Sequence, residues 1–414
     1  MFLSRKVKSY ITVLDIGTSK ICGLMAHISA DGTPEIIGVG HAPAKGIKAG
    51  AVVDLEKATE CIGSVISQIE QQANHPVDSV SITISSTYLK SYHLSREVPI
   101  EADHPITASD VKHLVDSILT TGIPSDEEIL LAVPLGYAVD KEKGIADPRG
   151  LYAHFLKAYV HIVTIPENQL KNLVMVFDRC HVRIDRKIPT PYASALGALS
   201  EEEKDIGVTA VDMGGGTTSF ALFMNGGLVH LGLVPQGGNA ITRDIAQVLS
   251  TSLDTAERLK TLNGVAFLSP RDELDRIIFP LINEENESNV QLPRSDLIKI
   301  IIPRLEDILE KLNGQLNERE TFAIATRRLV LCGGGALLQG MKEKSESIIG
   351  ANIRIAKINQ IKCLPNQLDS YTFITCIGLL KYVLSKSNTR PTVHFDETAP
   401  QKSHVRKVLQ WLLK

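Results

Sequence analysis

Apolar residues along the chain follow two alternating spacings. Short apolar runs at residues 10–14, 21–28, 36–39 and 80–85 predict β-strands. Between them, residues 54–72 carry apolar side chains every three or four positions behind Asp54, which predicts a helix with an aspartate N-cap. Alternation of the two spacings is typical of an α/β protein.

The same alternation continues toward the end of the chain. Strands are predicted at residues 182–188, 208–211, 220–223 and 328–332, and helices at 167–177, 191–199, 242–249, 253–262, 295–312 and 373–384. Pro303 falls inside the segment 295–312, so we expect a kink there or two abutting helices. The charged runs at 201–205 and 283–289 are expected to be solvated loops.

An inserted segment and an internal repeat organise the chain. Between residues 86 and 161, a helix behind Thr107 and strands at 129–133 and 156–163, separated by a loop at 137–150, predict a small inserted α/β subdomain. Outside it, a strand, an Asp-x-Gly turn and a second strand occur near residue 15 and again near residue 212. This repeat predicts two related halves.

The composition is that of an ordinary globular protein. The 414 residues include 44 Lys plus Arg and 47 Asp plus Glu, a net charge of −3 that argues against a nucleic-acid-binding protein. We identify neither a signal peptide nor a run of about 18 apolar residues. The 6 cysteines lack CxxC spacing and the 12 histidines are scattered. We therefore expect buried thiols, structural or surface histidines and a cytoplasmic protein.

Two glycine-rich turns carry the first candidate chemistry. They read Asp15-Ile-Gly17-Thr18-Ser19-Lys20 and Asp212-Met-Gly214-Gly215-Gly216-Thr217-Thr218. Backbone amides without an obstructing Cβ, assisted by hydroxyls and one lysine, are the groups that a phosphate chain needs. Asp15 and Asp212 precede the turns, where a carboxylate can hold the water shell of Mg²⁺ or order a water molecule.

A third turn, Gly333-Gly334-Gly335, follows a predicted strand and opens a helix, which suits a nucleoside packed against backbone. Each glycine cluster alone is equally compatible with an ordinary tight turn. The three turns in this order are a more specific signal. Neither the Rossmann nor the Walker motif fits any of them.

The order of phosphate turn, inserted domain, second phosphate turn and adenosine turn resembles that of the actin-like ATPases. Within that superfamily, the sequence is similar to the FtsA family of bacterial cell-division proteins. The similarity rests on residues 134–140, 144–150, 211–219, 237–246 and 256–260, and it extends from Tyr10 to Trp411.

The resemblance implies an actin-like, two-lobed α/β fold around a nucleotide cleft. The implied first-lobe core comprises residues 10–84, 164–204 and 357–386, with the inserted subdomain at 85–163. The second lobe has a core at 205–242 and 311–356 and an outer subdomain at 243–310. A flexible linker at 387–401 and an amphipathic helix at 402–414 follow.

The resemblance also implies ATP and Mg²⁺ as ligands, with Gly237, Gly238, Glu257 and Lys260 on the adenosine side. Without the resemblance, the spacing of Glu257 and Lys260 on a predicted helix favours a solvated surface pair over two residues that contact a nucleoside. Many relatives in the superfamily carry Glu-Pro where this chain has Thr190-Pro191. Threonine is a poor substitute for a water-positioning carboxylate, so we expect ATP binding with at most slow hydrolysis.

The implied role is that of a self-assembling adaptor. The resemblance implies that this adaptor is a peripheral membrane protein, which ties FtsZ filaments to the cytoplasmic membrane at the septum. It also implies that the adaptor helps to recruit later division proteins. The resemblance places Arg304 where the acidic C-terminal tail of FtsZ binds. Sequence alone favours a surface arginine with no such partner.

The last 13 residues carry a membrane signal of their own. In a helix, Val405, Val408, Leu409 and Leu412 share one face flanked by Trp411 and Leu413, and basic residues lie largely opposite. A basic amphipathic helix with a tryptophan is typical of a membrane surface. A helix docked on the protein's own core is the alternative.

Other members of the superfamily offer competing functions. A sugar or acetate kinase requires a carboxylate base for its substrate, for which we identify no candidate motif. A chaperone ATPase requires a substrate-binding domain after residue 384, where we expect too few residues. A related pilus-assembly adaptor is the closest alternative.

Overall fold

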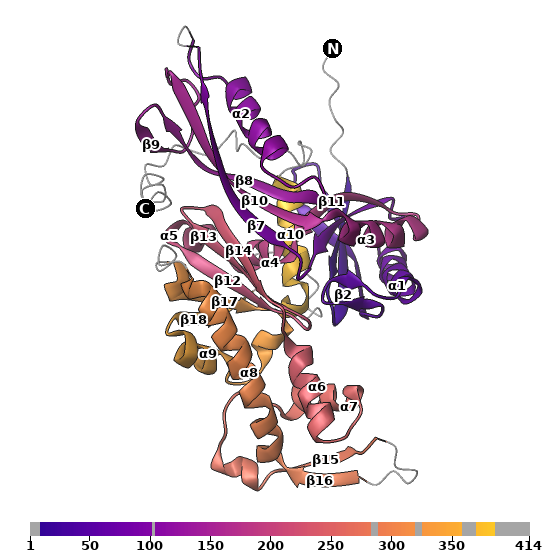
Figure 1. Ribbon diagram of the computed structural model, residues 1–414. Helices are drawn as coiled ribbons and strands as arrows, with labels where there is room; N and C mark the ends of the chain where they lie inside the picture. The colour runs from indigo at the N-terminus through magenta and orange to yellow at the C-terminus, as the bar shows by residue number, and fades with distance from the viewer. Residues whose placement is uncertain (1–8, 102–103, 283–288, 319–324, 358–369, 386–414) are drawn as a thin grey trace.

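The computed structural model describes residues 9–101, 104–282, 289–318, 325–357 and 370–385. Two five-stranded sheets form the centres of two lobes, with helices α4 (Thr190–Ala198) and α10 (Ile374–Ser385) between them (Figure 1). The inserted subdomain projects from the top of that view. At its bottom lie α6 (Gly238–Val248), α7 (Leu253–Asn263) and the hairpin of β15 (Arg276–Pro280) and β16 (Asn289–Pro293).

The first lobe is built on a sheet with the strand order β11-β6-β1-β2-β3. Strands β1, β2 and β3 form an antiparallel meander, β6 runs parallel to β1, and β11 runs parallel to β6. The bounds are β1 (Tyr10–Ile16), β2 (Lys20–Ile28), β3 (Pro34–Pro43), β6 (Ser79–Ile84) and β11 (Arg183–Pro189), with a short hairpin of β4 (Ile47–Lys48) and β5 (Ala51–Val52) after β3.

The second lobe repeats this topology in the order β14-β13-β12-β17-β18. Again three consecutive strands form an antiparallel meander, and two later strands add in parallel beside the first. The bounds are β12 (Val208–Met213), β13 (Thr218–Met224), β14 (Gly227–Val234), β17 (Arg328–Cys332) and β18 (Asn352–Ile355). The shared topology confirms the prediction of two related halves.

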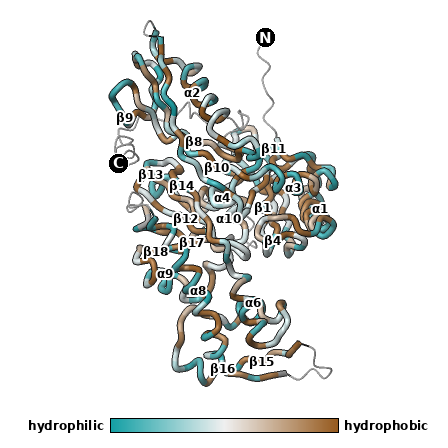
Figure 2. The backbone as a smooth tube through the Cα atoms, in the orientation of Figure 1, coloured by the Kyte–Doolittle hydropathy of each residue, from teal (hydrophilic) through white to brown (hydrophobic). Residues whose placement is uncertain are grey.

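Helices bury the faces of both sheets. Helices α1 (Leu55–Ala73) and α3 (Glu167–Arg179) cover the first sheet, whereas α6, α8 (Arg294–Asn317) and α9 (Met341–Ile349) pack on the second. The other faces turn toward α4 and α10, whose small and apolar residues fill the space between the sheets. In Figure 2 the central strands carry long hydrophobic segments. Short 3₁₀ turns are η1 (Pro270–Glu273), η3 (Ala325–Arg327), η4 (Gly334–Leu337) and η5 (Ser370–Phe373).

The inserted subdomain is a four-stranded sheet with one covering helix. Its order is β7-β10-β8-β9, with β7 (Lys90–Pro99), β8 (Glu127–Val139), β9 (Glu142–Ile145) and β10 (Phe155–Pro166). Helix α2 (Ala108–Thr121) begins at a capping box between Thr107 and Asp110. It buries Val111, Leu114, Val115 and Ile118 against the sheet, as its apolar spacing predicts.

Two predictions of loops are wrong, and a third, at Pro303, is wrong in one of its alternatives. Residues 137–150 are not simply a loop, because 137–139 end β8 and β9 pairs back on them. Residues 201–205 belong to helix α5 (Glu201–Ile206), which a capping box between Ser200 and Glu203 stabilises. The predicted helix over 295–312 is present as part of α8. It continues past Pro303 as one helix, so the alternative of two abutting helices is wrong, and buried leucines and isoleucines anchor both sides of the proline.

The strands that sequence analysis missed are β4, β5, β7, β9, β14, β15, β16 and β18. In β7, most residues are half-buried or exposed, so the run lacks a marked apolar pattern. Strands β7 and β18 pair with strands that other elements separate from them in sequence, β10 and β17. The other missed strands are short or lie in hairpins with the neighbouring strand. Of the charged run 283–289, only Asn289, which begins β16, lies within the described residues.

Close packing of α4 on α10 gives a stability prediction. A Cβ at Gly378 would stand 1.8 Å from the carbonyl oxygen of Ala193, whereas a Cβ at Gly314 in α8 would meet no atom of the described residues within 4 Å. Gly378→Ala should therefore destabilise the fold by about 1–3 kcal/mol. Gly314→Ala should stabilise it by up to about 1 kcal/mol through helix propensity. Thermal unfolding of both variants tests this, and a higher midpoint for Gly378→Ala would contradict it.

Candidate functional site

A cleft of about 570 Å³ lies between the lobes, and all three glycine turns line it. Helix α7 contributes Glu257 and Lys260 to the same wall. The lining includes every residue that sequence analysis assigned to ATP or Mg²⁺, namely Asp15, Gly17, Thr18, Ser19, Lys20, Asp212, Gly214, Gly215, Gly216, Thr217, Thr218, Gly237, Gly238, Glu257, Lys260, Gly333, Gly334 and Gly335. The fold therefore brings together residues that lie more than 300 positions apart in the sequence.

The first two glycine turns have the same local structure. The amide of Gly17 donates to the carbonyl of Lys20 at 3.0 Å, and the amide of Gly214 donates to that of Thr217 at 3.0 Å. Each turn connects the first two strands of its meander. The internal repeat thus extends into the cleft and places two equivalent turns opposite each other.

Glycine is required where these turns meet. A Cβ at Gly215 would lie 1.8 Å from Ser19 Oγ, a side-chain atom that can rotate away. A Cβ at Gly237 would lie 2.3 Å from the carbonyl oxygen of Gly214, a backbone atom that cannot. The amide of Gly238 donates to this same carbonyl at 3.0 Å, which fixes the start of α6 against the second turn.

Asp15 is the penultimate residue of β1, lines the cleft and is 7% exposed. Its Oδ1 accepts a hydrogen bond from Thr83 Oγ1 at 2.6 Å. Burial raises the pKa of Asp15 to about 6, and the charge of Asp212 adds to the rise, while the Thr83 hydrogen bond and Lys20 oppose it. The environment of Asp15 therefore favours either a protonated carboxyl group or a carboxylate that is neutralised by a cation.

Asp212 holds the equivalent position on β12. Ser194 Oγ, from α4, donates to Asp212 Oδ2 at 2.5 Å and lies 3.0 Å from Thr375 Oγ1 of α10. Burial also raises the pKa of Asp212, against the effect of the Ser194 hydrogen bond. Two carboxylates with raised pKa values line one cleft, an arrangement that a divalent cation would relieve.

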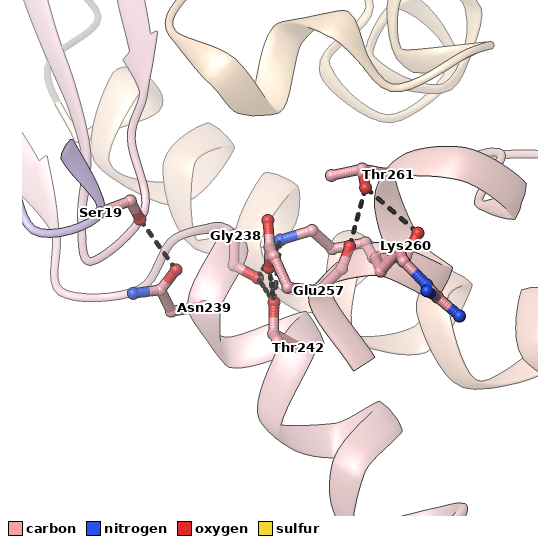
Figure 3. A network of polar contacts seen from close by, with 8 residues as sticks. Ser19, Gly238, Asn239, Thr242, Glu257, Lys260 and Thr261 are labelled. Carbon is pink, nitrogen blue, oxygen red and sulfur yellow. Dashed lines mark hydrogen bonds and ion pairs between the residues drawn. The ribbon is translucent and has the colours of Figure 1, made fainter. Parts of the chain in front are cut away.

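Figure 3 shows the α6–α7 wall of the cleft. Lys260 Nζ donates to Glu257 Oε2 at 2.6 Å, to Thr242 Oγ1 at 2.8 Å and to the carbonyl of Gly238 at 3.1 Å. Thr242 Oγ1 in turn donates to Glu257 Oε2 at 2.5 Å. The side chain of Lys260 is only 13% exposed, so this is not a fully solvated surface pair.

Sequence analysis missed several residues of the cleft. Ser19 Oγ donates to Asn239 Oδ1 at 3.0 Å and thereby links the lobes across the cleft (Figure 3). Asn239 follows the Gly237-Gly238 pair, a signal that could have identified it. Ser194 and Thr375 carry no local signal, because only the packing of α4 on α10 brings them to Asp212.

Two hydroxyls in the cleft have no hydrogen-bond partner within the described part of the chain. They are Thr190 Oγ1, at the start of α4, and Thr218 Oγ1, at the start of β13. Both are buried, with Thr190 9% exposed and Thr218 0% exposed. A buried hydroxyl without a partner is costly, so these atoms suit a polar ligand.

Arg304 lies on α8, with its side chain 32% exposed. Its guanidinium donates to both carboxylate oxygens of Asp244, at 2.6 Å and 3.2 Å, and to Asp307 Oδ2 at 3.2 Å. Lys311 donates to the same oxygen of Asp307 at 2.8 Å. The arginine is therefore part of a network of internal ion pairs.

The proposed membrane residues Val405, Val408, Leu409, Trp411, Leu412 and Leu413 lie outside the described residues. Among the helices that the structure describes, none is both long and apolar enough to cross a membrane.

Comparison with known proteins decides the family. The family model of cell division protein FtsA matches residues 209–378, and that of the SHS2 domain inserted in FtsA matches residues 86–164. A cell division protein FtsA from Agrobacterium fabrum is 33% identical over 391 residues, covering 92% of this chain and 88% of that protein. The chain belongs to the FtsA family of cell-division proteins. An FtsA from Escherichia coli is 29% identical and covers 98% of both chains.

Solved structures agree with the fold expected for an FtsA-family chain. A PilM–PilN type IV pilus biogenesis complex has a TM-score of 0.64 at 14% identity, covering 90% of this chain and 98% of that one. MreB5 of Spiroplasma citri bound to ADP has a TM-score of 0.55 at 14% identity, covering 91% and 96%. The prediction of an actin-like α/β fold with an inserted subdomain is confirmed.

The raised pKa of Asp15 gives this FtsA-family chain a pH signature. The folded chain retains the Asp15 proton up to about pH 6, whereas the unfolded chain loses it near pH 3.8. Stability is therefore lost as the pH rises between these values, by about 3 kcal/mol once Asp15 is ionised. Without metal or nucleotide, Asp15→Asn should match the wild type near pH 4 and exceed it in stability above pH 7.

Urea unfolding across this pH range measures the effect. Asp31→Asn is a control in which the dependence of stability on pH should have the opposite sign, because hydrogen bonds from Thr33 lower the pKa of Asp31. That variant should lose stability relative to the wild type as the pH rises. A difference between Asp15→Asn and wild type that does not vary with pH would contradict the assignment.

Proposed function

We propose that this protein binds Mg-ATP, assembles with copies of itself and ties FtsZ filaments to the cytoplasmic face of the cell membrane at the division septum. There it also helps to recruit later division proteins. The observation that carries the nucleotide part is the convergence of three glycine turns and two aspartates in one cleft of about 570 Å³. Membership of the FtsA family supports the adaptor part.

The chain's own residues fit a magnesium nucleotide. The glycine turns leave backbone approach open, and Thr190 and Thr218 offer buried hydroxyls that have no partner within the described residues. Lys20 adds a positive charge at the first turn, where it donates to the carbonyl of Thr372 at 3.1 Å. The proposal assigns the water shell of Mg²⁺ to Asp15 and Asp212, and the ion would neutralise phosphate charge when bound.

Hydrolysis is proposed to be slow. The start of α4 presents Thr190, which cannot act as a carboxylate base. Asp212 remains able to order a water molecule, but one of its oxygens accepts the Ser194 hydrogen bond. The cleft therefore serves nucleotide binding better than turnover, which suits an assembly protein rather than a catalytic enzyme.

Attachment to the membrane is assigned to residues 402–414. Burying each apolar side chain of this segment is favourable by about 1.5–3 kcal/mol. Ordering the segment costs about 1–2 kcal/mol per residue, so a single tail binds weakly. Several tails on one polymer bind far more tightly through effective concentration. Self-assembly and membrane binding therefore support each other.

Binding of the acidic FtsZ tail is assigned to the surface around Arg304. Because Asp244 and Asp307 already pair with this arginine, a tail carboxylate would share or replace internal partners. Arg304→Glu would add a third acid beside these two and disturb the subdomain directly. Arg304→Gln is the cleaner substitution, since it removes the charge and keeps a polar side chain.

The test of the whole proposal is co-sedimentation of the protein and FtsZ with liposomes, with and without Mg-ATP. FtsZ should pellet with the vesicles only when this protein is present. Deletion of residues 402–414, or Trp411→Glu, should abolish liposome binding and leave Mg-ATP affinity unchanged. Binding should rise with anionic lipid and fall with salt. If the truncated chain still sediments with liposomes, the anchor lies elsewhere.

A peptide titration tests the Arg304 assignment. Arg304→Gln should weaken binding of an acidic FtsZ tail peptide roughly tenfold or more, because a hydrogen bond between charged groups contributes about 1.5–3 kcal/mol. Mg-ATP affinity should not change. Arg179→Gln, an exposed arginine on α3 of the other lobe, is the matched control and should bind normally. Equal peptide affinity for both variants would exclude Arg304 as a receiver.

A pilus-assembly adaptor is the alternative function. The fold similarity to PilM favours it only at the level of architecture, at 14% identity. The FtsA relatives share about a third of their residues with most of this chain. The cell-division role is therefore the better supported proposal.

A further inference from the structure

Three histidines that are scattered in the sequence meet where the inserted subdomain contacts the second lobe. They are His93 on β7, His161 on β10 and His230 on β14, and one donor atom of each lies within 4.8 Å of the other two. His93 and His161 are direct cross-strand neighbours, with stacked rings 4.8 Å apart. His230 comes from the edge strand of the second sheet, which lies against β7, β8 and β10 (Figure 1).

A hydrogen bond to the backbone fixes which ring nitrogen of His93 carries the proton. His93 Nε2 lies 2.7 Å from the carbonyl oxygen of Val229. Since a carbonyl only accepts, Nε2 carries the proton and Nδ1 of the neutral ring carries the lone pair. Ligand histidines in metal sites are commonly oriented by this same bond from the second ring nitrogen to a backbone carbonyl.

A serine hydroxyl connects the other two rings. Ser91 lies on β7, two residues before His93 and on the same face of the strand. Its Oγ is 2.6 Å from His161 Nε2 and 3.4 Å from His230 Nδ1. His161 is 0% exposed, and the other two histidines are half-buried. The three rings therefore converge on a largely desolvated point.

From this arrangement we infer that His93, His161 and His230 form a site for a divalent transition-metal ion of the zinc class. Neutral imidazole is a preferred ligand of zinc, and three histidines with an open fourth position make a tetrahedral zinc site. Zinc–nitrogen distances of about 2.0–2.1 Å separate tetrahedral ligands by about 3.3 Å. The candidate ligand atoms lie within 4.8 Å of one another, so binding of an ion requires side-chain rotation that brings them closer.

A metal ion at this site would link two parts of the structure. Two ligands belong to the inserted subdomain, which is continuous with the first lobe, and the third belongs to β14 of the second lobe. A bound ion would hold the inserted subdomain against the second lobe without involving the cleft. The inference goes beyond the proposed function and does not depend on nucleotide, FtsZ or membrane binding.

The test is a zinc titration of the full, untagged chain after removal of metal with EDTA. Isothermal calorimetry should show one Zn²⁺ bound per chain. Mutation of a residue that only hydrogen-bonds to a metal ligand lowers metal affinity roughly 10- to 100-fold. His93→Asn and His230→Asn each remove a ligand itself, so each should lower zinc affinity by more than that. His113→Asn, an exposed histidine on α2 of the same subdomain, is the matched control and should bind as the wild type does.

Two further measurements keep the test valid if a variant folds poorly. Zn²⁺ should raise the thermal unfolding midpoint of the wild type, and addition of EDTA should lower the midpoint again. Co²⁺ bound in place of zinc should give the visible absorption spectrum of a tetrahedral site. The inference is overturned if the wild type binds no stoichiometric zinc. It is also overturned if His113→Asn weakens binding as much as His230→Asn, or if the triple variant of all three histidines still binds one ion.

Discussion

The structure depends on the close approach of backbone to backbone at the start of α6. The carbonyl of Gly214 accepts the amide of Gly238 at 3.0 Å, and no side chain fits at Gly237 between them. This contact fixes the second glycine turn on α6, and the Ser19–Asn239 hydrogen bond then fixes the first turn on the same helix. The two lobes consequently meet through their turns, and the cleft takes its shape from that meeting.

Electrostatics of the cleft follow from the same packing. Helices α4 and α10 fill the space between the sheets, so Asp15 and Asp212 are enclosed and their pKa values rise. Ionising both carboxylates is unfavourable without a cation. The cleft is thereby suited to a ligand that brings positive charge near the aspartates and accepts hydrogen bonds from the surrounding hydroxyls and amides.

Much of this arrangement could be predicted from the sequence, because its parts are local and repeated. Asp15 with Gly17 and Asp212 with Gly214 mark the two turns, and apolar spacing marks α1, α2 and the central strands. The rest arises from contacts between distant segments. Ser194 reaches Asp212 only because α4 packs on α10, and β7 forms only because β10 pairs with it.

Prediction from the sequence failed most clearly where long-range packing overrides a local signal. Pro303 does not end α8, since buried residues on both sides stabilise the helix. The acidic run at 201–205 is a different case, because the capping box of Ser200 and Glu203 is a local helix signal that was overlooked, and Glu203 also pairs with Arg354 of β18 at 2.6 Å. The histidines gave no motif, yet strand pairing and docking of the inserted subdomain bring three of them together.

The central claim is that the contact between the glycine turns and α6 shapes a site for Mg-ATP. Equilibrium titration of Mg-ATP into the purified wild type, Gly237→Ala and Gly63→Ala tests it most directly. A Cβ at Gly63, on α1, meets only Cys180 Sγ at 3.9 Å, so this control should bind as the wild type does. We predict one bound nucleotide for the wild type and at least a roughly tenfold loss for Gly237→Ala. Absence of binding to the wild type, or unchanged affinity in Gly237→Ala, would contradict the account.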